Sequence, residues 1–299
     1  MKIKNILLGI LPLGAALMLS GCSNDSLEDE SVIVTTTREY NDFDKWLEAN
    51  YINPYNISFK YRYEEMESDL NYYTVPAEYR KAVQMAHVVK YICMESYDEV
   101  AGIEFTRSYF PKEFFLIGEW EYRNNGTFIL GTAENGKKIL LSGINYFDKY
   151  KKNVEMLNHY YLKTIHHEFV HIMDQTKARP VDFKTITGTK YVSDLWSEEP
   201  YNKDFLKRGF ISAYSQQEDT EDFAEMISIY VCNTQSQWDE WMKEAGPEGA
   251  TLINAKLTLV KTYMKDNWNI DLNQLRDVVQ RRESDLAKGN IDLYDLTVK

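Results

Sequence analysis

Hydrophobic and polar residues follow different patterns in the two halves of the chain. In the first half, apolar residues form short runs or alternate with polar ones, which is typical of strands. We predict strands over residues 56–61, 114–122, 127–132 and 138–142, with turns at 124–126 and 135–136. The turns contain Asn and Gly, which favour tight hairpins. Residues 76–95 show the pattern of a helix that begins at a proline.

The second half is mostly helical. Apolar residues recur there at helical spacing, at Leu157, Tyr161, Ile165, Phe169 and Ile172. They form one stripe, as expected of a helix with one face toward the core. Further amphipathic helices are predicted over residues 252–268 and 272–282. We therefore expect an α+β fold, with an N-terminal mixed sheet and helices followed by a mainly helical C-terminal half.

The helix with this stripe also carries the pattern His167-Glu168-x-x-His171. Two histidines four residues apart lie on one helical face, where both imidazoles can bind one zinc ion. On a helical wheel this face is opposite the apolar stripe, so it can line a cleft. A carboxylate beside the first histidine can take a proton from zinc-bound water, so Glu168 is the candidate general base. A chance arrangement on a surface helix is the alternative.

The other histidines lie off this face. His159 and His166 are on a third side of the helix, and His87 is in a different predicted helix. We expect all three to be partly exposed polar residues that bind no metal. No histidine follows His171, and the position six residues after it is occupied by Lys177. A histidine as third ligand at that spacing is therefore excluded.

The third ligand should instead be a downstream carboxylate, which completes the His₂Glu set of catalytic zinc sites. The best candidates lie in the segment 221–225, which reads Glu-Asp-Phe-Ala-Glu. We predict that Glu221 is the ligand and that Glu225 accepts a hydrogen bond from a ligand imidazole and so orients it. Glu218 and Asp222 are the alternatives.

These carboxylates lie on a predicted helix. Residues 215–218 read Ser-Gln-Gln-Glu, a capping box that would start a helix running to about residue 231. Phe223, Ile227 and Tyr230 would share its buried face, opposite the two glutamates. Repulsion between like charges four residues apart destabilises a helix by about 0.2–0.5 kcal/mol. A bound dication would remove this repulsion. An acidic solvated helix is the alternative in a chain of net charge −12.

The amino terminus has the layout of a signal peptide, residues 1–21. Lysines at positions 2 and 4 precede an apolar run that ends at residue 19 and is too short to span a bilayer. The run ends in Leu19-Ser20-Gly21-Cys22, which resembles a bacterial lipobox, so Cys22 would be lipidated and anchor the chain to a membrane. A conventional signal before an ordinary cysteine is the alternative. Residues 22–38 are polar and acidic, and we expect a disordered tether.

One domain is predicted over residues 39–299, with lobes of about 39–176 and 177–299, and it is large enough for a substantial core. The net charge of −12 argues against nucleic acid as a partner, since phosphate binding needs clustered Lys and Arg. Cys93 and Cys232 lie in apolar helical contexts. A disulfide between them and two buried free thiols are both consistent with the sequence.

The two motifs together resemble the zinc site of gluzincin peptidases of the anthrax lethal factor type. The resemblance rests on the stretch 167–174, which reads HEFVHIMD, and on Tyr214, seven residues before Glu221. It implies that Glu221 and the two histidines bind one zinc ion per chain. It also implies that Tyr214 reaches the reaction centre, where a phenol can stabilise an oxyanion or protonate the leaving amine. Asp174 and Glu225 would lie outside the ligand shell and orient the ligand side chains.

The same resemblance implies a zincin-like fold with the active-site cleft between the two halves. In such folds an edge strand forms one wall of the cleft and pairs with an extended peptide. Residues 128–132 are the candidate edge strand. Residues 177–210, between the two metal helices, carry scattered Gly, Pro and aromatic residues and are expected to shape a substrate pocket.

The whole chain also resembles zinc metallohydrolase lipoproteins of the Bacteroides group, which are found beside outer-membrane nutrient importers. This implies an outer-membrane lipoprotein at the cell surface or the periplasmic face, with importer proteins as partners. We expect a zinc peptidase that acts on a peptide or protein. One alternative is a non-catalytic zinc-containing binding or scaffold protein of the importer. Another is a hydrolase for an amide in a peptidoglycan stem or a modified glycan.

Overall fold

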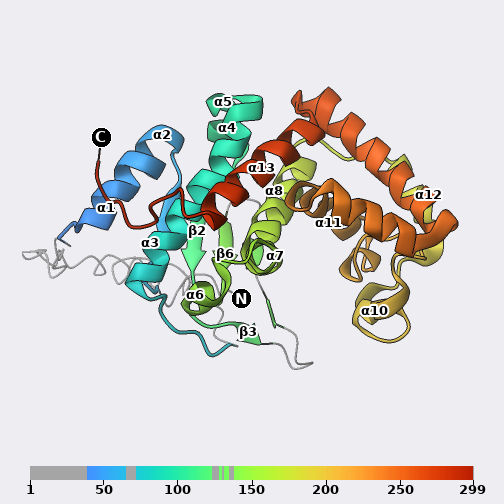
Figure 1. Cartoon of the computed structure of the whole chain (residues 1–299), viewed down its shortest axis with the longest axis horizontal. Coiled ribbons are helices and arrows are strands. Elements are labelled where there is room, and N and C mark those ends of the chain that lie inside the picture. The colour runs from blue at the N-terminus through green and yellow to red at the C-terminus, as the bar shows by residue number, and fades with distance from the viewer. Residues whose placement is uncertain (1–38, 65–71, 123–127, 130, 135–137, 299) are drawn as a thin grey trace, which may run out of the picture. The chain divides into compact units, whose positions relative to one another are not determined.

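The computed structural model describes residues 39–64, 72–122, 128–129, 131–134 and 138–298 (Figure 1). The predicted signal peptide, Cys22 and the acidic tether up to residue 38 lie outside the described residues, as do the turns at 124–126 and 135–136. From Tyr40 onward the chain forms one compact unit, and the division into two lobes stays a prediction. The fold is α+β, as the sequence predicts.

A four-stranded mixed sheet has the strand order β1-β2-β6-β5. Its strands are β1 (Ser58–Lys60), β2 (Glu113–Leu116), β6 (Lys138–Leu141) and β5 (Gly131–Glu134). The first three run parallel, in a register that pairs Phe114 with Ile139, and β5 runs antiparallel to β6. All four β6 residues are buried, which explains why this strand is a continuous apolar run after its lysine.

The predicted strand over residues 114–122 is interrupted at Gly118. The backbone N–H of Gly118 donates a hydrogen bond of 2.7 Å to the carbonyl of Val75. A Cβ atom at this position would lie 2.3 Å from the carbonyl oxygen of Pro76, so only glycine allows this approach. The chain therefore leaves β6 here, and pairing resumes only at β3 (Glu121–Tyr122).

The predicted strand over residues 127–132 is divided between two sheets. Residues Phe128–Ile129 form β4, which pairs with β3 in a separate antiparallel ladder, whereas β5 begins at Gly131. Among the described strands, β5 is one edge of the four-stranded sheet, and it contacts the helix that carries the histidines. Of the candidate edge strand over residues 128–132, residues 131–132 lie in this edge, residues 128–129 lie in the other ladder and residue 130 lies outside the described residues. Its role as a wall of the cleft stays a prediction.

The first half of the chain also forms helices. They are α1 (Asp42–Leu47), η1 (Glu48–Ile52), α2 (Asn53–Tyr55), α3 (Tyr79–Val88), η3 (Val89–Met94), α4 (Glu95–Ala101) and α5 (Ile103–Tyr109). The helix predicted over residues 76–95 begins three residues later, because Pro76 pairs with Ile117 beside the sheet. It continues past residue 95 and ends only before Gly102, which has a φ of 86°.

The second half is helical throughout its regular structure. Its elements are η4 (Ile144–Tyr146), α6 (Phe147–Tyr150), α7 (Val154–Leu157), η5 (Asn158–Leu162), α8 (Lys163–Thr176), α9 (Asp182–Thr187), η6 (Gly188–Lys190), η7 (Ser193–Ser197), α10 (Tyr201–Asp204), η8 (Tyr214–Gln216), α11 (Asp219–Cys232), α12 (Gln235–Trp268) and α13 (Leu272–Ala287). The helix predicted over 252–268 is the second part of α12, which is kinked at Gly246. The helix predicted over 272–282 continues to Ala287.

The α8 helix lies in the centre of this unit, between the sheet and α11 (Figure 1). The predicted apolar stripe from Leu157 to Ile172 is buried over its whole length. Within it, the ring of Phe169 lies 4.7 Å from that of Phe110 and edge-on to Tyr97 at 4.9 Å. The buried face predicted for α11 is also confirmed, because Phe223, Ile227 and Tyr230 are all buried. Packing of these two helices brings their polar faces together.

Cys93 and Cys232 are buried free thiols, so the disulfide alternative is wrong for this structure. Burial raises the pKa of both thiols, which keeps them protonated and unreactive.

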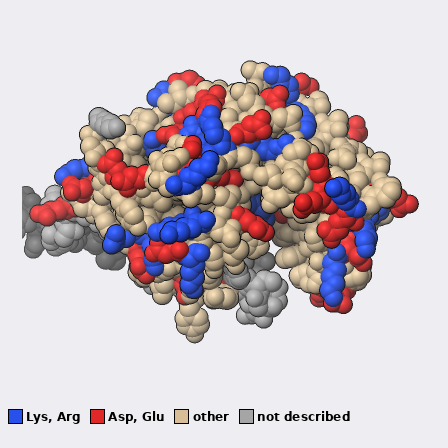
Figure 2. Space-filling view, in the orientation of Figure 1, with Lys and Arg blue, Asp and Glu red and all other residues tan. Residues whose placement is uncertain are grey.

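On the face seen in Figure 2, acidic and basic side chains are interspersed. Among the described residues, no helix combines the length and the apolar character that crossing a membrane requires.

Candidate metal centre

Two helices bring three metal-binding side chains together. The α8 helix supplies His167 and His171, and α11 supplies Glu221. The Nε2 atoms of the two histidines are 3.0 Å apart. Glu221 Oε2 lies 3.0 Å from Nε2 of His167 and 3.5 Å from Nε2 of His171. Among the described residues, this is the one group of three or more His, Cys, Asp and Glu side chains close enough to share an ion.

The geometry of these three atoms fits zinc. Ligand atoms at about 2.0–2.1 Å from a tetrahedral zinc ion are separated from one another by about 3.3–3.4 Å. The three observed separations of 3.0, 3.0 and 3.5 Å bracket that value. Two imidazole nitrogens and a carboxylate oxygen form the His₂Glu set of catalytic sites, which leaves a fourth position open. The residues present therefore fit a catalytic zinc ion.

The surrounding charges also favour a cation. Burial lowers the pKa of His167, but its contacts with Glu221 and Glu225 outweigh burial and raise that pKa to about 9. Burial opposes ionisation of Glu221 as well, yet the two histidines hold its pKa well below the usual range. A positive charge is thus needed to balance the carboxylates, and either a proton on an imidazole or a metal dication would supply it.

Glu225 lies close to the ring nitrogen of His167 that is turned away from the other metal-binding atoms. Its Oε1 atom is 2.9 Å from Nδ1 of His167, although the ring N–H is not well aligned with it. Lys163 donates a hydrogen bond of 2.8 Å to the same oxygen, and Ser212 donates one of 2.7 Å to Oε2. Burial raises the pKa of Glu225, but Lys163 and His167 outweigh this effect and lower it. The carboxylate is therefore an ionised, buried support for one ligand.

Glu168 follows the first histidine on α8 and is only 9% exposed. Its carboxylate is close enough to the centre for its charge to raise the pKa of both His167 and Tyr214. A buried carboxylate therefore directly follows a metal-binding histidine on α8, and its charge acts on the groups of the centre. A general base at this position would have to reach the attacking water.

Tyr214 lies on η8, just before α11. Its ring centre is 6.0 Å from that of His167, and it packs edge-on against Trp196 at 5.1 Å. Burial raises the pKa of the phenol, and the charges of Glu221, Glu225 and Glu168 raise it further. The phenol therefore stays protonated and can donate a hydrogen bond near the metal centre.

The structure assigns other roles to the remaining candidates. Both carboxylate oxygens of Asp174 are bound by Arg179, and within the described residues no hydrogen bond joins Asp174 to a ligand histidine. Asp222 is fully buried on another side of α11, where Lys256 and Tyr191 bind its Oδ2 atom. Glu218 precedes the first turn of α11 and does not belong to the group of close metal-binding atoms.

The predicted capping box at residues 215–218 is wrong. Ser215 lies in η8, and α11 begins four residues later, at Asp219. The backbone N–H of Ser215 is bound by the hydroxyl of Ser212, which closes a separate turn. That turn uses the capping residues for itself, so the helix starts after Glu218 without a side-chain cap.

The prediction that His87, His159 and His166 are partly exposed is correct for His159 only. His166 is fully buried, because the phenol of Tyr97 covers this side of α8 and lies 3.0 Å from Nδ1. Burial lowers its pKa to about 4, so the ring is neutral. None of the three belongs to the metal-binding group.

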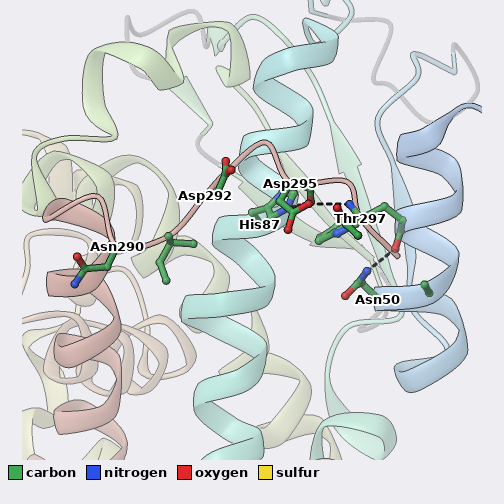
Figure 3. A pocket seen from close by; sticks show the side chains of 9 residues that line it. Asn50, His87, Asn290, Asp292, Asp295 and Thr297 are labelled. Atoms are coloured by element: carbon green, nitrogen blue, oxygen red, sulfur yellow. Dashed lines mark hydrogen bonds between the residues drawn. The ribbon is translucent and has the colours of Figure 1, made fainter. Parts of the chain in front are cut away.

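His87 is buried beneath the C-terminal segment (Figure 3). Its ring stacks on Trp46 at 4.1 Å, and its Nε2 atom is 2.9 Å from the carbonyl of Asp295. The same residues line a cavity of about 370 Å³ that also includes Asn50 and Asp292. The histidine joins the end of the chain to α3.

Lys163 and Ser212 are the site residues that the sequence analysis missed. Lys163 is four residues before His167 on the same helical face, so the spacing alone could have suggested it. Ser212 is in an irregular segment without any periodic pattern. Only the packing of that segment against α11 reveals its contact with Glu225.

Two comparisons with known proteins find a match to this chain. A family model described as "Putative zinc-binding metallo-peptidase" matches residues 36–273, which include every residue of the metal centre. A solved structure from Bacteroides caccae ATCC 43185, described in the same words, is 39% identical. The match covers 89% of this chain and 100% of that chain, with a TM-score of 0.75. A search of the curated proteins finds no match.

The family model spans most of the chain, and the solved relative shares its fold over the whole of its own length. The two histidines and the glutamate that fit a zinc ion lie inside the matched region. This chain therefore belongs to the family of zinc-binding metallo-peptidases.

Proposed function

We propose that this chain is a zinc-dependent peptidase of the gluzincin type, with His167, His171 and Glu221 as the ligands of one ion. The observation that carries the proposal is the convergence of these three donor atoms, with the buried Glu168 next to His167 on the same helix. A purely structural zinc site closes its fourth position with a protein ligand and needs no base. Three ligands with an adjacent carboxylate are instead typical of hydrolytic sites.

When bound, zinc lowers the pKa of water to about 7 and polarises a carbonyl group. Glu168 accepts a proton from the attacking water and transfers it to the leaving amine, so one carboxylate acts first as base and then as acid. The phenol of Tyr214 donates a hydrogen bond to the oxygen that becomes negative during attack. Glu225, held by Lys163 and Ser212, keeps the ring of His167 in its orientation.

Metal analysis and peptide cleavage test this proposal together. The wild-type chain should hold about one zinc ion, and His171→Ala should lose it. Glu168→Gln should retain the metal while release of fragments from a mixed peptide library stops. His159→Ala, an exposed histidine one helical segment earlier, is the matched control and should leave both properties unchanged. Cleavage that survives Glu168→Gln contradicts the mechanism, and a zinc-loaded wild type that cleaves no peptide points to the binding or scaffold alternative.

We also propose that the chain is anchored by a lipid at Cys22 in the outer membrane, with importer proteins as partners. The support is the sequence of residues 1–22, which resembles a lipoprotein signal. Cys22→Ala should abolish incorporation of labelled fatty acid and release the chain from the membrane fraction. Protease treatment of intact cells then distinguishes the cell surface, where the chain is digested, from the periplasmic face, where it is protected.

A further inference from the structure

Ser212 lies at a junction between two parts of the metal centre. Its hydroxyl donates a hydrogen bond of 2.7 Å to Oε2 of Glu225 and accepts one of 3.0 Å from the backbone N–H of Ser215. The hydroxyl of Ser215 is also 3.0 Å away. One oxygen atom therefore connects a carboxylate on α11 with the short turn η8.

The bond to Ser215 holds the turn that carries Tyr214. Ser215 is fully buried, so its N–H cannot turn to water if the hydroxyl of Ser212 is removed. The next two N–H groups, of Gln216 and Gln217, are already bound to carbonyls of the same turn. The Ser212 hydroxyl thus binds a backbone N–H three residues later, in the way that serine side chains cap helices.

The bond to Glu225 acts on the other part of the centre. That carboxylate is 1% exposed and lies 2.9 Å from Nδ1 of His167, the ring nitrogen that faces away from the metal-binding atoms. Lys163 binds one of its oxygens and Ser212 binds the other, so the two donors together determine the plane of the carboxylate. Loss of either donor would let the carboxylate rotate away from the imidazole.

We propose that Ser212 is a positioning residue that couples the carboxylate behind His167 to the turn bearing Tyr214. The ligand imidazole and the phenol, whose ring centres are 6.0 Å apart, are thereby held in one fixed relation. This inference rests on the proposed function in one respect, since it is there that Tyr214 acts on the substrate. The bond between Ser212 and Glu225 and its effect on the metal site do not depend on the substrate.

Zinc affinity, measured by competition with a chelator, tests whether Ser212 supports the metal centre through Glu225. This test needs no turnover. Ser212→Ala should bind zinc about 10-fold more weakly than wild type. This is the lower end of the loss in affinity that follows when a group supporting a metal ligand is removed. We expect the lower end because Lys163 still holds Glu225. Ser212→Thr, which keeps a hydroxyl, should stay within about twofold of wild type. Ser228→Ala is the matched control, since Ser228 is a buried serine on α11 whose hydroxyl donates a hydrogen bond of 3.4 Å to the backbone carbonyl of Glu225.

A double-mutant cycle with Tyr214→Phe tests whether Ser212 also positions the phenol of Tyr214. If Ser212 positions the phenol, kcat/KM of the double variant Ser212→Ala/Tyr214→Phe should be no lower than that of Ser212→Ala alone. Tyr214→Phe by itself should leave zinc affinity unchanged. If Ser212→Ala does not fold, Ser212→Cys replaces it, because a thiol is a much weaker donor and acceptor.

Two results would overturn the inference. One is a folded Ser212→Ala protein with the zinc affinity of the wild type, and the other is a cycle in which the two losses of kcat/KM simply multiply. A wild type that binds zinc and cleaves no peptide would refute the proposed function instead. In that case the zinc affinities of the serine variants still decide whether Ser212 supports the metal centre.

Discussion

The buried ion pair between Lys256 and Asp222 offers a sharp test of how α12 supports the metal helix. Both side chains are 0% exposed. The ammonium group is 2.5 Å from Oδ2 of Asp222 and 3.0 Å from the carbonyl of Gly209, and it lies 4.0 Å from the ring centre of Phe210. Asp222 adjoins Glu221 in sequence, so this contact joins α12 to the residue next to a proposed ligand.

Lys256→Met keeps the length of the aliphatic chain and removes the charge. It leaves the Asp222 carboxylate buried and without its cation, which costs about 3–5 kcal/mol of unfolding free energy. For a domain of this size, 1 kcal/mol shifts the melting temperature by about 2–4 °C. Lys256→Met should therefore melt about 6–20 °C below wild type. The double variant Lys256→Met/Asp222→Asn should regain most of this loss, because a neutral amide can still accept the bond from Tyr191.

Urea and thermal unfolding followed by circular dichroism measure both variants. The comparison of single and double variants separates the cost of an unpaired buried charge from the loss of packing. A loss below about 1 kcal/mol for Lys256→Met would refute the reasoning. So would a double variant as unstable as the single one, since the unpaired carboxylate would then not be the cause.

Two further predictions concern the core and the acid stability of the fold. Phe169→Ala removes a fully buried ring from the core face of α8 and should destabilise the chain by about 3–5 kcal/mol in urea unfolding; a loss below 1 kcal/mol would show that the site collapses around the cavity. For Asp44, burial raises the pKa but the bonds from Arg62 outweigh it and lower the pKa. Its stabilisation is therefore present above the unfolded pKa of about 3.9 and is lost as pH falls through the lower folded pKa. Asp44→Asn should consequently lose less stability than wild type between pH 7 and about pH 2, and equal losses would contradict this assignment.

Local periodicity explains what the sequence predicted well. The stripe from Leu157 to Phe169 and the buried face of α11 follow from 3.6-residue spacing, which depends only on neighbours along one helix. The relation of His167 to His171 is local in the same sense, because the helix itself determines the distance between residues four apart. The choice of Glu221 over Asp222 could be argued from the wheel, since adjacent residues point about 100° apart.

Boundaries were predicted less well, because they depend on contacts from elsewhere in the chain. The strand at 114–122 stops where Gly118 meets the segment at Pro76. The late start of α11, by contrast, has a local cause, because the turn at Ser215 takes its cap from Ser212, three residues earlier. Ser212 lies in a segment without a periodic pattern, so the sequence did not reveal this turn.

The sequence by itself determined that two histidines and a glutamate share one side of a helix, and its periodicity favoured Glu221 among the downstream carboxylates as the third ligand. Only the tertiary structure decided that Glu221 comes within reach of the histidines, that Asp174 binds Arg179, and that Lys163 and Ser212 hold Glu225. The physical reason is the distance along the chain over which each effect acts. Helical spacing places side chains within one element, whereas a distance of 3.0 Å between His167 and Glu221, 54 residues apart, exists only once α8 and α11 have packed.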